Sequence, residues 1–478
     1  MFDDLREFLK KAGELGQVSQ IEGADWDLEI GSITEVAAYE YPDSSALLFD
    51  RIKDYQPGYR VVTNFLDTKV MIALASGFPL ETENVELVRA FRDKFKEEFR
   101  PVPPVVVETG PVLENIDTGN EVDLFKFPVP KWHKFDGGRY IGTGCMVINK
   151  DPDDGWVNLG AYRVQAYDKN TAGIFMAPGR HGDVIRRKYW EKGLSCPTAV
   201  VCGCEPLLFC ISGSAVAQGV SEYDYTGWLR NKPVEVVKGK ITDLPLPATA
   251  EIVLEGEYMP PEVESRLEGP FGEFTGYYAS GARDEAVFRV KSVMYRNNPI
   301  LLGAPPLVGR SSGYQRFAYS GLMWMELDRR VPGVKGVWIF SESGARAISA
   351  ISLEQKYPGH AKQALMFASG YATAEPWRFI IVVDEDIDPS SISDVLWALG
   401  TRCDPETSID ILRGCRGTPL DPMLTPEMRH NRNYVHSRGL INACKPYQWI
   451  KDFPRTIKSS PEELAKTREK WGKFLSGN

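Results

Sequence analysis

The chain has 478 residues, a formal net charge of −9 at pH 7, 43% hydrophobic residues and 25% charged residues. This length supports two or three domains that each bury a core, and the composition is that of a globular protein. The negative charge and the lack of a lysine/arginine stripe argue against nucleic-acid binding. No apolar run approaches the roughly 20 residues of a membrane span, and the first residues suggest a helix instead of a signal peptide. We therefore expect a cytoplasmic protein without a membrane or nucleic-acid partner.

The N-terminal region alternates helix and strand. Asp3 is suited to cap a first helix, and strands are expected at residues 46–49 and 60–63. The sequence Arg100-Pro-Val-Pro-Pro then breaks the pattern, and such proline density is typical of an extended connection. We accordingly assign an N-terminal α/β domain to residues 1–110.

The middle of the chain, residues 111–305, consists mostly of short strand-like runs separated by turn residues. Many short strands with turn signals are typical of a barrel. Trp156 to Tyr167 and Leu207 to Ile211 are two of the expected strands. After Pro306 the α/β pattern returns, which predicts a third domain at residues 306–478.

The third domain contains two further features. Asp384-Glu-Asp-Ile-Asp388 has the look of a metal cluster, but acids that follow a buried strand more simply form a solvated turn. Ser460-Pro-Glu-Glu463 is a capping-box sequence, which predicts a last helix.

Eight cysteines are scattered along the chain. Cys202 and Cys204 form one C-x-C pair without a second pair, and they would point to opposite faces of a strand. This arrangement disfavours zinc and favours reduced thiols in the core.

The stretch from Glu268 to Tyr277 places two carboxylates, Glu268 and Glu273, five residues apart across a Gly-Pro-Phe-Gly bend. Glycines let the backbone reverse and Pro270 stiffens the reversal, so both carboxylates can face one cavity. In a shared, partly buried site, repulsion and desolvation would raise at least one pKa, giving a neutral proton donor beside an ionised partner. The alternative is a glycine-rich hairpin with two solvated glutamates.

These residues belong to a longer series of motifs. The series resembles the UbiD family of reversible decarboxylases, whose active enzymes use prenylated flavin mononucleotide, and the resemblance runs through most of the chain. The motifs that carry it are, in chain order, Phe-Pro-Val-Pro-Lys-Trp-His133, Asn158-x4-Arg163, Arg180-His181, Ser221-Glu222, Glu268 to Tyr277, Val382 to Asp388 and Val395 to Arg402.

The resemblance implies a fold and an assembly. The fold is of the α/β (α+β) class, with an N-terminal α/β domain, a central flavin-binding split β-barrel and a C-terminal α/β domain. In the family the C-terminal region joins protomers, so a homodimer or a higher homo-oligomer is expected.

The resemblance also implies a cofactor site. Asn158, His181 and Glu222 match positions that bind a divalent ion, commonly Mn²⁺, which bridges to the flavin phosphate, and their donor atoms suit such a cation. A potassium ion, held largely by backbone carbonyls, is implied nearby, and Arg180 is a candidate to help neutralise the phosphate. Without the family, His181 is a structural loop histidine and Glu222 an acid favourable to a helix N-terminus.

Arg163, Glu268 and Glu273 match the family's catalytic Arg-Glu-acid set, and Glu273 is the candidate acid. The arginine fork is suited to hold a carboxylate bidentately, although a surface strand arginine is the simpler interpretation. In a regular strand Asn158 and Arg163 would lie on opposite faces. Either they serve different sides of the site, or Gly160 marks a bulge that turns one of them.

Decarboxylation at an sp² carbon leaves a carbanion-like species for which side chains offer no electron sink, so a cofactor is required. The resemblance names prenylated FMN, made by a separate flavin prenyltransferase, and as substrate an aromatic, heteroaromatic or α,β-unsaturated carboxylic acid that exchanges CO₂. Trp338 is a candidate for stacking on the substrate ring, with a core tryptophan as the alternative. Three other functions stay open: a conventional flavin oxidoreductase, a non-catalytic flavin-binding assembly subunit and a metal-dependent hydrolase.

Overall fold

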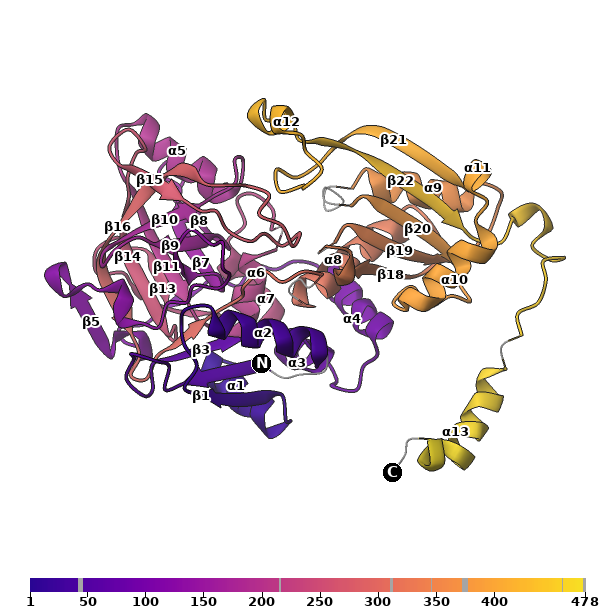
Figure 1. The fold of residues 1–478 in the computed structure, drawn as a ribbon, viewed down its shortest axis with the longest axis horizontal. Coiled ribbons are helices and arrows are strands. Elements are labelled where there is room, and N and C mark those ends of the chain that lie inside the picture. Colours follow the sequence, from indigo (N-terminus) through magenta and orange to yellow (C-terminus); the bar gives the residue numbers. More distant parts are fainter. Residues whose placement is uncertain are drawn as a thin grey trace.

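The computed structural model describes residues 1–41, 46–214, 216–309, 313–344, 346–371, 377–457 and 459–475. Figure 1 shows an N-terminal part, a β-rich central part, and a C-terminal part built on a second large sheet. The last helix lies apart from the rest of the chain at the C-terminal end.

The N-terminal part contains a sheet with the strand order β1-β2-β3-β17. β1 and β2 are parallel, β2 and β3 antiparallel, and β3 and β17 parallel. The expected strands at residues 46–49 and 60–63 are confirmed as β2 and β3. The elements are α1 (Leu5–Glu14), β1 (Val18–Glu22), α2 (Glu29–Glu40), β2 (Ala46–Asp50), β3 (Arg60–Thr63), α3 (Lys69–Ser76) and α4 (Asn84–Lys96).

The first helix is capped by Asp4, and the prediction of Asp3 was wrong by one residue. The Asp4 carboxylate accepts a 2.7 Å hydrogen bond from Glu7 N, which satisfies a free N–H of the first turn. The Asp3 carboxylate instead pairs with Arg230 and Lys232 of the central part. Asp4 therefore caps the helix, and Asp3 links it to the central part.

The central part runs from β4 to β17, with short 3₁₀ turns at Pro111–Leu113, Gly119–Glu121 and Leu124–Lys126. Its strands and helices are β4 (Val105–Val106), β5 (Asn115–Thr118), β6 (Arg139–Gly142), β7 (Cys145–Lys150), β8 (Val157–Gly160), β9 (Arg163–Ala166), β10 (Thr171–Phe175), α5 (His181–Glu191), β11 (Cys196–Cys202), α6 (Pro206–Ser212), α7 (Glu222–Arg230), β12 (Glu235–Lys238), β13 (Pro245–Pro247), β14 (Ile252–Tyr258), β15 (Ser265–Glu268), β16 (Arg283–Tyr295) and β17 (Ile300–Leu302).

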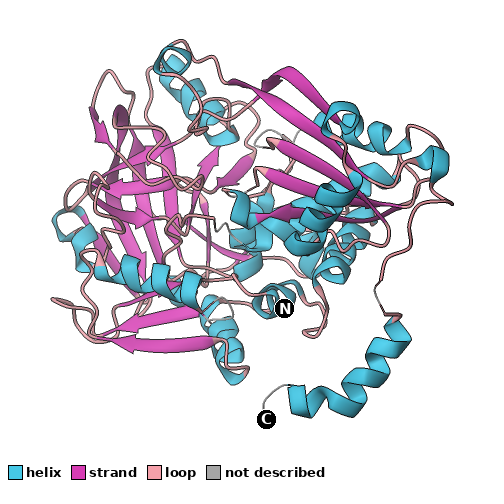
Figure 2. Cartoon of the chain, turned by 45° about the vertical axis from the view of Figure 1, so that its right-hand side comes forward, coloured by secondary structure: helices cyan, strands magenta, loops and turns pink. Residues whose placement is uncertain are grey.

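The main sheet of this part follows the order β6-β9-β10-β16-β14-β11-β7-β8, with β15 and β5 also paired to β16. β8 and β9 are consecutive in sequence but lie near opposite ends of this order. Only residues 161 and 162 join them, and three Cα steps span at most about 11 Å. The sheet must therefore curl until its ends approach, which makes it barrel-like, and Figure 2 shows its strands apart from those of the C-terminal sheet.

Two expected strands of the central part need correction. The run from Trp156 to Tyr167 is not one strand, because it is interrupted between β8 and β9. Leu207 to Ile211 is helical and belongs to α6, where Pro206 occupies the first turn and the Glu205 carboxylate accepts a 2.6 Å hydrogen bond from Leu208 N. Proline in the first turn and a carboxylate at the N-cap are helix-start signals, and they outweigh the β-like composition of this short run.

The C-terminal part contains a sheet with the order β18-β19-β20-β22-β21, in which β19, β20 and β22 are parallel. Its first helix, α8, packs against α4 of the N-terminal part and against β18, so these two parts share one apolar core. Short 3₁₀ turns occur at Ser341–Ser343 and Tyr447–Trp449. The elements are α8 (Gly313–Asp328), β18 (Val334–Phe340), β19 (Ile348–Leu353), α9 (His360–Ser369), β20 (Phe379–Asp384), α10 (Ile392–Arg402), α11 (Pro405–Ser408), β21 (Ile409–Arg416), α12 (Pro426–His430), β22 (Val435–Ala443) and α13 (Pro461–Leu475).

The acidic run after β20 is not simply a solvated turn. Asp384 is buried and forms a 2.8 Å ion pair with Arg402. Arg402 forms a second ion pair with Asp386, also at 2.8 Å. Lys445 adds a 3.0 Å ion pair to Asp386. These acids therefore join the end of β20 to α10 and to the segment after β22.

The capping box of the last helix is confirmed. Ser460 N donates to Glu463 Oε2 at 2.7 Å, and Glu463 N donates back to Ser460 Oγ at 3.2 Å. Within the described residues, none of the helices combines the length and the apolar character needed to cross a membrane. All eight cysteines are free thiols, and most of them are buried.

Candidate active site

Arg163 joins both glutamates of the bend in one buried cluster. Its Nε and Nη2 atoms each lie 2.8 Å from a different oxygen of Glu268, and its Nη1 donates to Oε1 of Glu273. Arg163 is 9% exposed, Glu268 0% and Glu273 6%. The glutamates are thus not the solvated pair of a surface hairpin, and Arg163 is not a surface arginine.

The local fold brings these three residues together from separate segments. Arg163 begins β9, Glu268 ends β15, and Glu273 lies in the loop between β15 and β16. Gly269 N donates to Gln165 Oε1 at 2.8 Å, which fastens the start of this loop to β9.

The loop is also held from the side of residues 136–137. Gly272 N donates to Asp136 Oδ1 at 3.2 Å, and Gly137 N donates to Pro270 O at 2.7 Å. A Cβ atom on Gly137 would lie 1.9 Å from the Gly269 carbonyl oxygen, so only glycine allows this approach. The bend is therefore built against a matching backbone and keeps its shape.

The two carboxylates have different surroundings. Glu268 uses both oxygens, because Arg163 binds each of them and Tyr140 OH lies 3.2 Å from Oε1. Glu273 Oε1 accepts from Arg163 and, at 2.7 Å, from Ser280 Oγ. Glu273 Oε2 has no hydrogen-bond partner among the described residues. Glu268 is thus a saturated carboxylate, whereas Glu273 keeps one oxygen available.

The electrostatics of the cluster favour a permanent charge on the arginine. Burial alone would lower the pKa of Arg163, but Glu268, followed by Glu273, raises it above its usual value. Burial, followed by the charge of Glu268, raises the pKa of Tyr140, so its hydroxyl stays a donor to Glu268. The cluster therefore holds a fixed cation and a fixed donor around Glu268.

Sequence reasoning missed several residues that support this cluster. Tyr140, Gln165 and Ser280 carry no local motif. Strand pairing brings Tyr140 and Gln165 to the bend, whereas Ser280 lies in the same loop as Glu273. Phe175 lies opposite Arg163 in the strand register, and its ring centroid is 4.3 Å from the Arg163 guanidinium carbon. Arg283 contacts the same ring at 4.2 Å. Cation–π contact of this kind adds to the placement of buried guanidinium groups.

The three residues predicted to bind a divalent ion come from elements that pack together. Asn158 lies in β8, His181 begins α5 and Glu222 begins α7, and both helices contact β8. Glu222 Oε2 accepts a 2.7 Å hydrogen bond from Leu159 N, and the centroids of the His181 and Trp156 rings are 4.9 Å apart. Asn158 and Arg163 do not share one regular strand, because the chain breaks after Gly160 and β8 and β9 lie near opposite ends of the curled sheet. Arg180, the N-cap of α5, is exposed.

These donors fit a divalent cation. Burial raises the pKa of the Glu222 carboxyl to about 8, and no basic side chain pairs with it in the part of the chain that the structure describes. Burial, followed by the charge of Arg180, lowers the pKa of His181, which favours the neutral ring that binds metals. Asn158 Nδ2 is buried and has no hydrogen-bond partner among the described residues. A cation would supply the counter-charge that Glu222 lacks.

The predicted set contains only two acidic or imidazole donors. Among the described residues, no three His, Cys, Asp or Glu side chains gather into a group able to hold a metal. Asn158 is the third donor of the predicted set, and an amide oxygen is a common ligand of hard and borderline cations.

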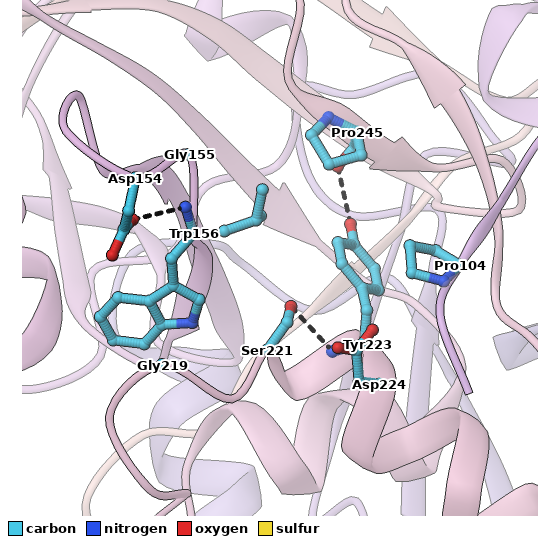
Figure 3. Close-up of a pocket in the computed structure, with 10 residues that line it drawn as sticks. Pro104, Asp154, Gly155, Trp156, Gly219, Ser221, Tyr223, Asp224 and Pro245 are labelled. Atoms are coloured by element: carbon cyan, nitrogen blue, oxygen red, sulfur yellow. Dashed lines mark hydrogen bonds between the residues drawn. The ribbon is translucent and has the colours of Figure 1, made fainter. Parts of the chain in front are cut away.

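A cavity of about 460 Å³ borders this region. Its lining includes Trp156, Val157, Ser221 and Tyr223, which are the sequence neighbours of Asn158 and Glu222. In Figure 3, Trp156 lies on one side of the opening, and Tyr223 lies on the other, with its hydroxyl bonded to the Pro245 carbonyl oxygen. Trp156 therefore contacts both this cavity and the His181 ring.

Trp338 lies in the core of the C-terminal part. It is 4% exposed, and its ring packs edge-to-face against Phe317 with centroids 5.2 Å apart. The guanidinium of Arg316 lies 5.1 Å from the same ring. This environment favours the core interpretation of Trp338 over a role in stacking on a substrate.

Comparison with known proteins decides the family. Three profiles of the 3-octaprenyl-4-hydroxybenzoate carboxy-lyase (UbiD) family match the chain: the N-terminal domain at residues 6–91, the Rift-related domain at 105–309 and the C-terminal domain at 315–443. The chain belongs to the UbiD family. The resemblance seen in the motifs is thereby confirmed.

Relatives and solved structures of the UbiD family match over almost the full length. A phenolic acid decarboxylase of Bacillus subtilis is 31% identical over 99% of this chain and 98% of its own. The open form of the vanillic acid decarboxylase of Sedimentibacter hydroxybenzoicus has 28% identity and a TM-score of 0.84, and covers 100% of this chain and 99% of its own. An evolved dimeric form of the UbiD-class enzyme HmfF from Pelotomaculum thermopropionicum, in complex with prFMN, has 27% identity and a TM-score of 0.81, and covers 97% and 98%.

These findings confirm the expected three-domain UbiD fold and the expected class of enzyme, a carboxy-lyase. The domain limits at residues 110 and 305 and the roles of the site residues stay predictions.

Proposed function

We propose that this protein catalyses the reversible, non-oxidative decarboxylation of an aromatic, heteroaromatic or α,β-unsaturated carboxylic acid with prenylated FMN as its cofactor. The observation that carries the proposal is the unequal pair of carboxylates around Arg163. Glu268 is saturated by Arg163 and Tyr140, whereas Glu273 keeps one oxygen without a partner among the described residues. Such a pair offers a fixed anion beside a group that is able to carry and deliver a proton.

Each residue of the cluster has a distinct task. Arg163 holds Glu268 bidentately and offers its remaining hydrogen-bonding capacity to the substrate carboxylate, which orients the bond that breaks. Glu268 keeps the guanidinium in place. Glu273 delivers a proton to the product carbon from Oε2, because Oε1 is occupied by Arg163 and Ser280. With a substrate carboxylate bound, three acids share one guanidinium, so a proton on Glu273 reduces the negative charge of the buried cluster.

The cofactor site is assigned to β8 and the two helices that meet it. Asn158, His181 and Glu222 would hold Mn²⁺ or another divalent ion, with a potassium ion bound nearby. His181 and Glu222 each begin a helix that contacts β8, and a helix N-terminus favours an anion such as the flavin phosphate. Arg180 adds positive charge at the same place. When bound, prenylated FMN would supply the sink for the electron pair that stays on the substrate carbon as CO₂ leaves, and it would come from a separate flavin prenyltransferase.

A homodimer or a higher homo-oligomer forms through the last helix. α13 exposes Leu464, Trp471 and Phe474, the last at 81%, and it lies apart from the rest of the chain (Figure 1). An amphipathic helix of 15 residues is marginal by itself, which supports a second copy as its partner. Deletion of residues 457–478 should then lower the oligomeric state in sedimentation or native mass measurements. An unchanged assembly would contradict this assignment.

The test of the proposed function is the absorption spectrum and intact mass of the bound cofactor after co-expression with a flavin prenyltransferase, measured together with CO₂ release. Bound prenylated FMN with CO₂ release from an aromatic acid supports the proposal. Ordinary FMN with turnover of NAD(P)H would indicate an oxidoreductase, and bound flavin without turnover would indicate an assembly subunit. Activity without flavin would indicate a hydrolase.

A further inference from the structure

The C-terminal part reaches the loop that carries Glu273 through one arginine. Arg429 belongs to α12, in the connection between β21 and β22, and Figure 1 places α12 at the end of that strand pair nearest the central part. The Nη1 atom of Arg429 donates to the carbonyl oxygen of Ala279. Ala279 lies between β15 and β16, in the same loop as Glu273.

The other contacts of Arg429 are to its own part of the chain. They go to the carbonyl oxygens of Asp421 at 2.7 Å, Leu424 at 3.3 Å and Pro419 at 3.4 Å. Within the described residues, Arg429 has no ion pair with a carboxylate. A guanidinium that donates only to main-chain carbonyls connects the backbone segments that carry them. Because the guanidinium is a rigid fork, it also fixes the relative positions of these segments.

The segment that Arg429 gathers is itself anchored in the C-terminal part. The Asp421 carboxylate pairs with Arg378 at 2.5 Å and accepts from Met423 N at 2.9 Å. His436 lies 3.6 Å from the same carboxylate. The position of Arg429 therefore follows the position of the C-terminal sheet.

On the other side of the contact, the path to Glu273 is short. Ser280 follows Ala279 in the chain, and its hydroxyl donates to Glu273 Oε1 at 2.7 Å. The same loop meets the C-terminal part a second time, where Thr275 Oγ1 donates to Leu420 O at 3.4 Å. Residues 419–429 of the C-terminal part thus hold the loop at two points, Thr275 and Ala279.

We infer that Arg429 is a positioning residue for Glu273. It fixes the Ala279 carbonyl, Ala279 places Ser280, and Ser280 orients the carboxyl group so that Oε2 stays directed to the substrate. The arrangement ties the geometry of the acid to the placement of the C-terminal part. This inference rests on the proposed function, in which Glu273 is the proton donor.

The test compares Arg429→Ala, Arg429→Lys and Ser280→Ala with a matched control, Arg432→Ala. Arg432 lies three residues further on, is exposed and makes no side-chain hydrogen bond among the described residues. The first readout needs no cofactor: hydrogen exchange in residues 273–282 of the protein without flavin. The second is kcat of the flavin-loaded enzyme, together with the amount of flavin retained.

We expect Arg429→Ala to speed exchange in this loop and to lower kcat by about tenfold, less than the roughly 10²-fold cost of a full 1 Å misplacement. Flavin retention should not change. Arg429→Lys keeps the charge but loses the fork, so it should show the same direction with a smaller effect, and it serves if the alanine variant does not fold. The double variant Ser280→Ala/Arg429→Ala should be little worse than the stronger single variant, because both act on one path. Arg432→Ala should match the parent.

Parental exchange and parental kcat in Arg429→Ala would overturn the inference. A variant that loses flavin together with activity would also overturn it, since Arg429 would then act on cofactor binding. Glu273→Gln distinguishes failure of the Arg429 inference from failure of the proposed function. If Glu273→Gln is inactive and Arg429→Ala is parental, only the Arg429 inference fails. If Glu273→Gln turns over like the parent, the proposed function fails first.

Discussion

The cluster around Arg163 and the predicted metal site around Glu222 differ in how many of their polar atoms find a partner within the protein. Arg163, Glu268 and Glu273 pair with one another and with neighbouring hydroxyl groups. Glu222, in contrast, is buried with main-chain N–H groups as its hydrogen-bond partners in the described part of the chain, and Asn158 Nδ2 has none there.

The difference separates two kinds of preorganisation. A group whose charged residues pair with one another is in place before the substrate arrives, and its residues should contribute to stability as well as to catalysis. A group that leaves a carboxylate without a counter-charge is completed by a ligand. Substitution there should affect ligand retention more than folding.

The largest effect is expected for Arg163→Ala. This change leaves two buried carboxylates without their cation, which should lower the free energy of unfolding by about 3–5 kcal/mol and abolish activity. Chemical denaturation of the flavin-free protein measures the stability change. Arg163→Ala combined with Glu268→Gln should be less destabilised than the sum of the single variants. Additive losses would show that the pair is not coupled.

A large effect on cofactor retention, with little effect on folding, is expected at the second group. Glu222→Gln keeps the shape of the side chain and an acceptor for Leu159 N, so the free energy of unfolding should change by less than about 1 kcal/mol. His181→Ala/Glu222→Ala, or removal of the metal by a chelator, should release the flavin. Intact-mass and absorption measurements after gel filtration check this. Full cofactor retention in the double variant would contradict the assignment.

A smaller effect is expected at the junctions between the domains. We expect the domains to move at the proline-rich connection of residues 101–105 and at the transition near Pro306, and to close over the substrate so that water is excluded. Hydrogen exchange at these junctions should therefore change when an aromatic acid that is turned over binds. Identical exchange with and without such a substrate would count against closure.

The sequence indicated that the two glutamates of the bend come together, but it did not indicate which neighbouring side chains bind them. Glu268 and Glu273 were expected to face one cavity because the glycines of the bend report on backbone reversal directly. The task of Tyr140 was not foreseeable, since it reaches Glu268 only through pairings between distant strands. Ser280 lies in the same loop as Glu273, but a single serine there carries no sequence signal for the hydrogen bond that it makes.

The errors in secondary structure have equally local causes. Leu207 to Ile211 was expected to be a strand from its apolar residues, but Glu205 and Pro206 form a helix start that decides the outcome. Gly160 indicated a bulge at most, whereas the chain breaks there into two strands, β8 and β9, near opposite ends of the curled sheet. In the same way, Trp338 in an apolar strand had no feature that separates a core ring from a substrate-binding ring.

The central claim is that Glu273 protonates the product carbon, and Glu273→Gln tests it most directly. The amide keeps the size of the side chain and an oxygen for Ser280 but removes the acid. The measurement is CO₂ release together with deuterium incorporation into the product carbon in heavy water, with the amount of bound flavin as the control. The account predicts a loss of at least ~10²-fold in both rates at unchanged flavin content, the usual scale of general acid catalysis. Parental turnover and parental deuterium incorporation in Glu273→Gln would contradict it.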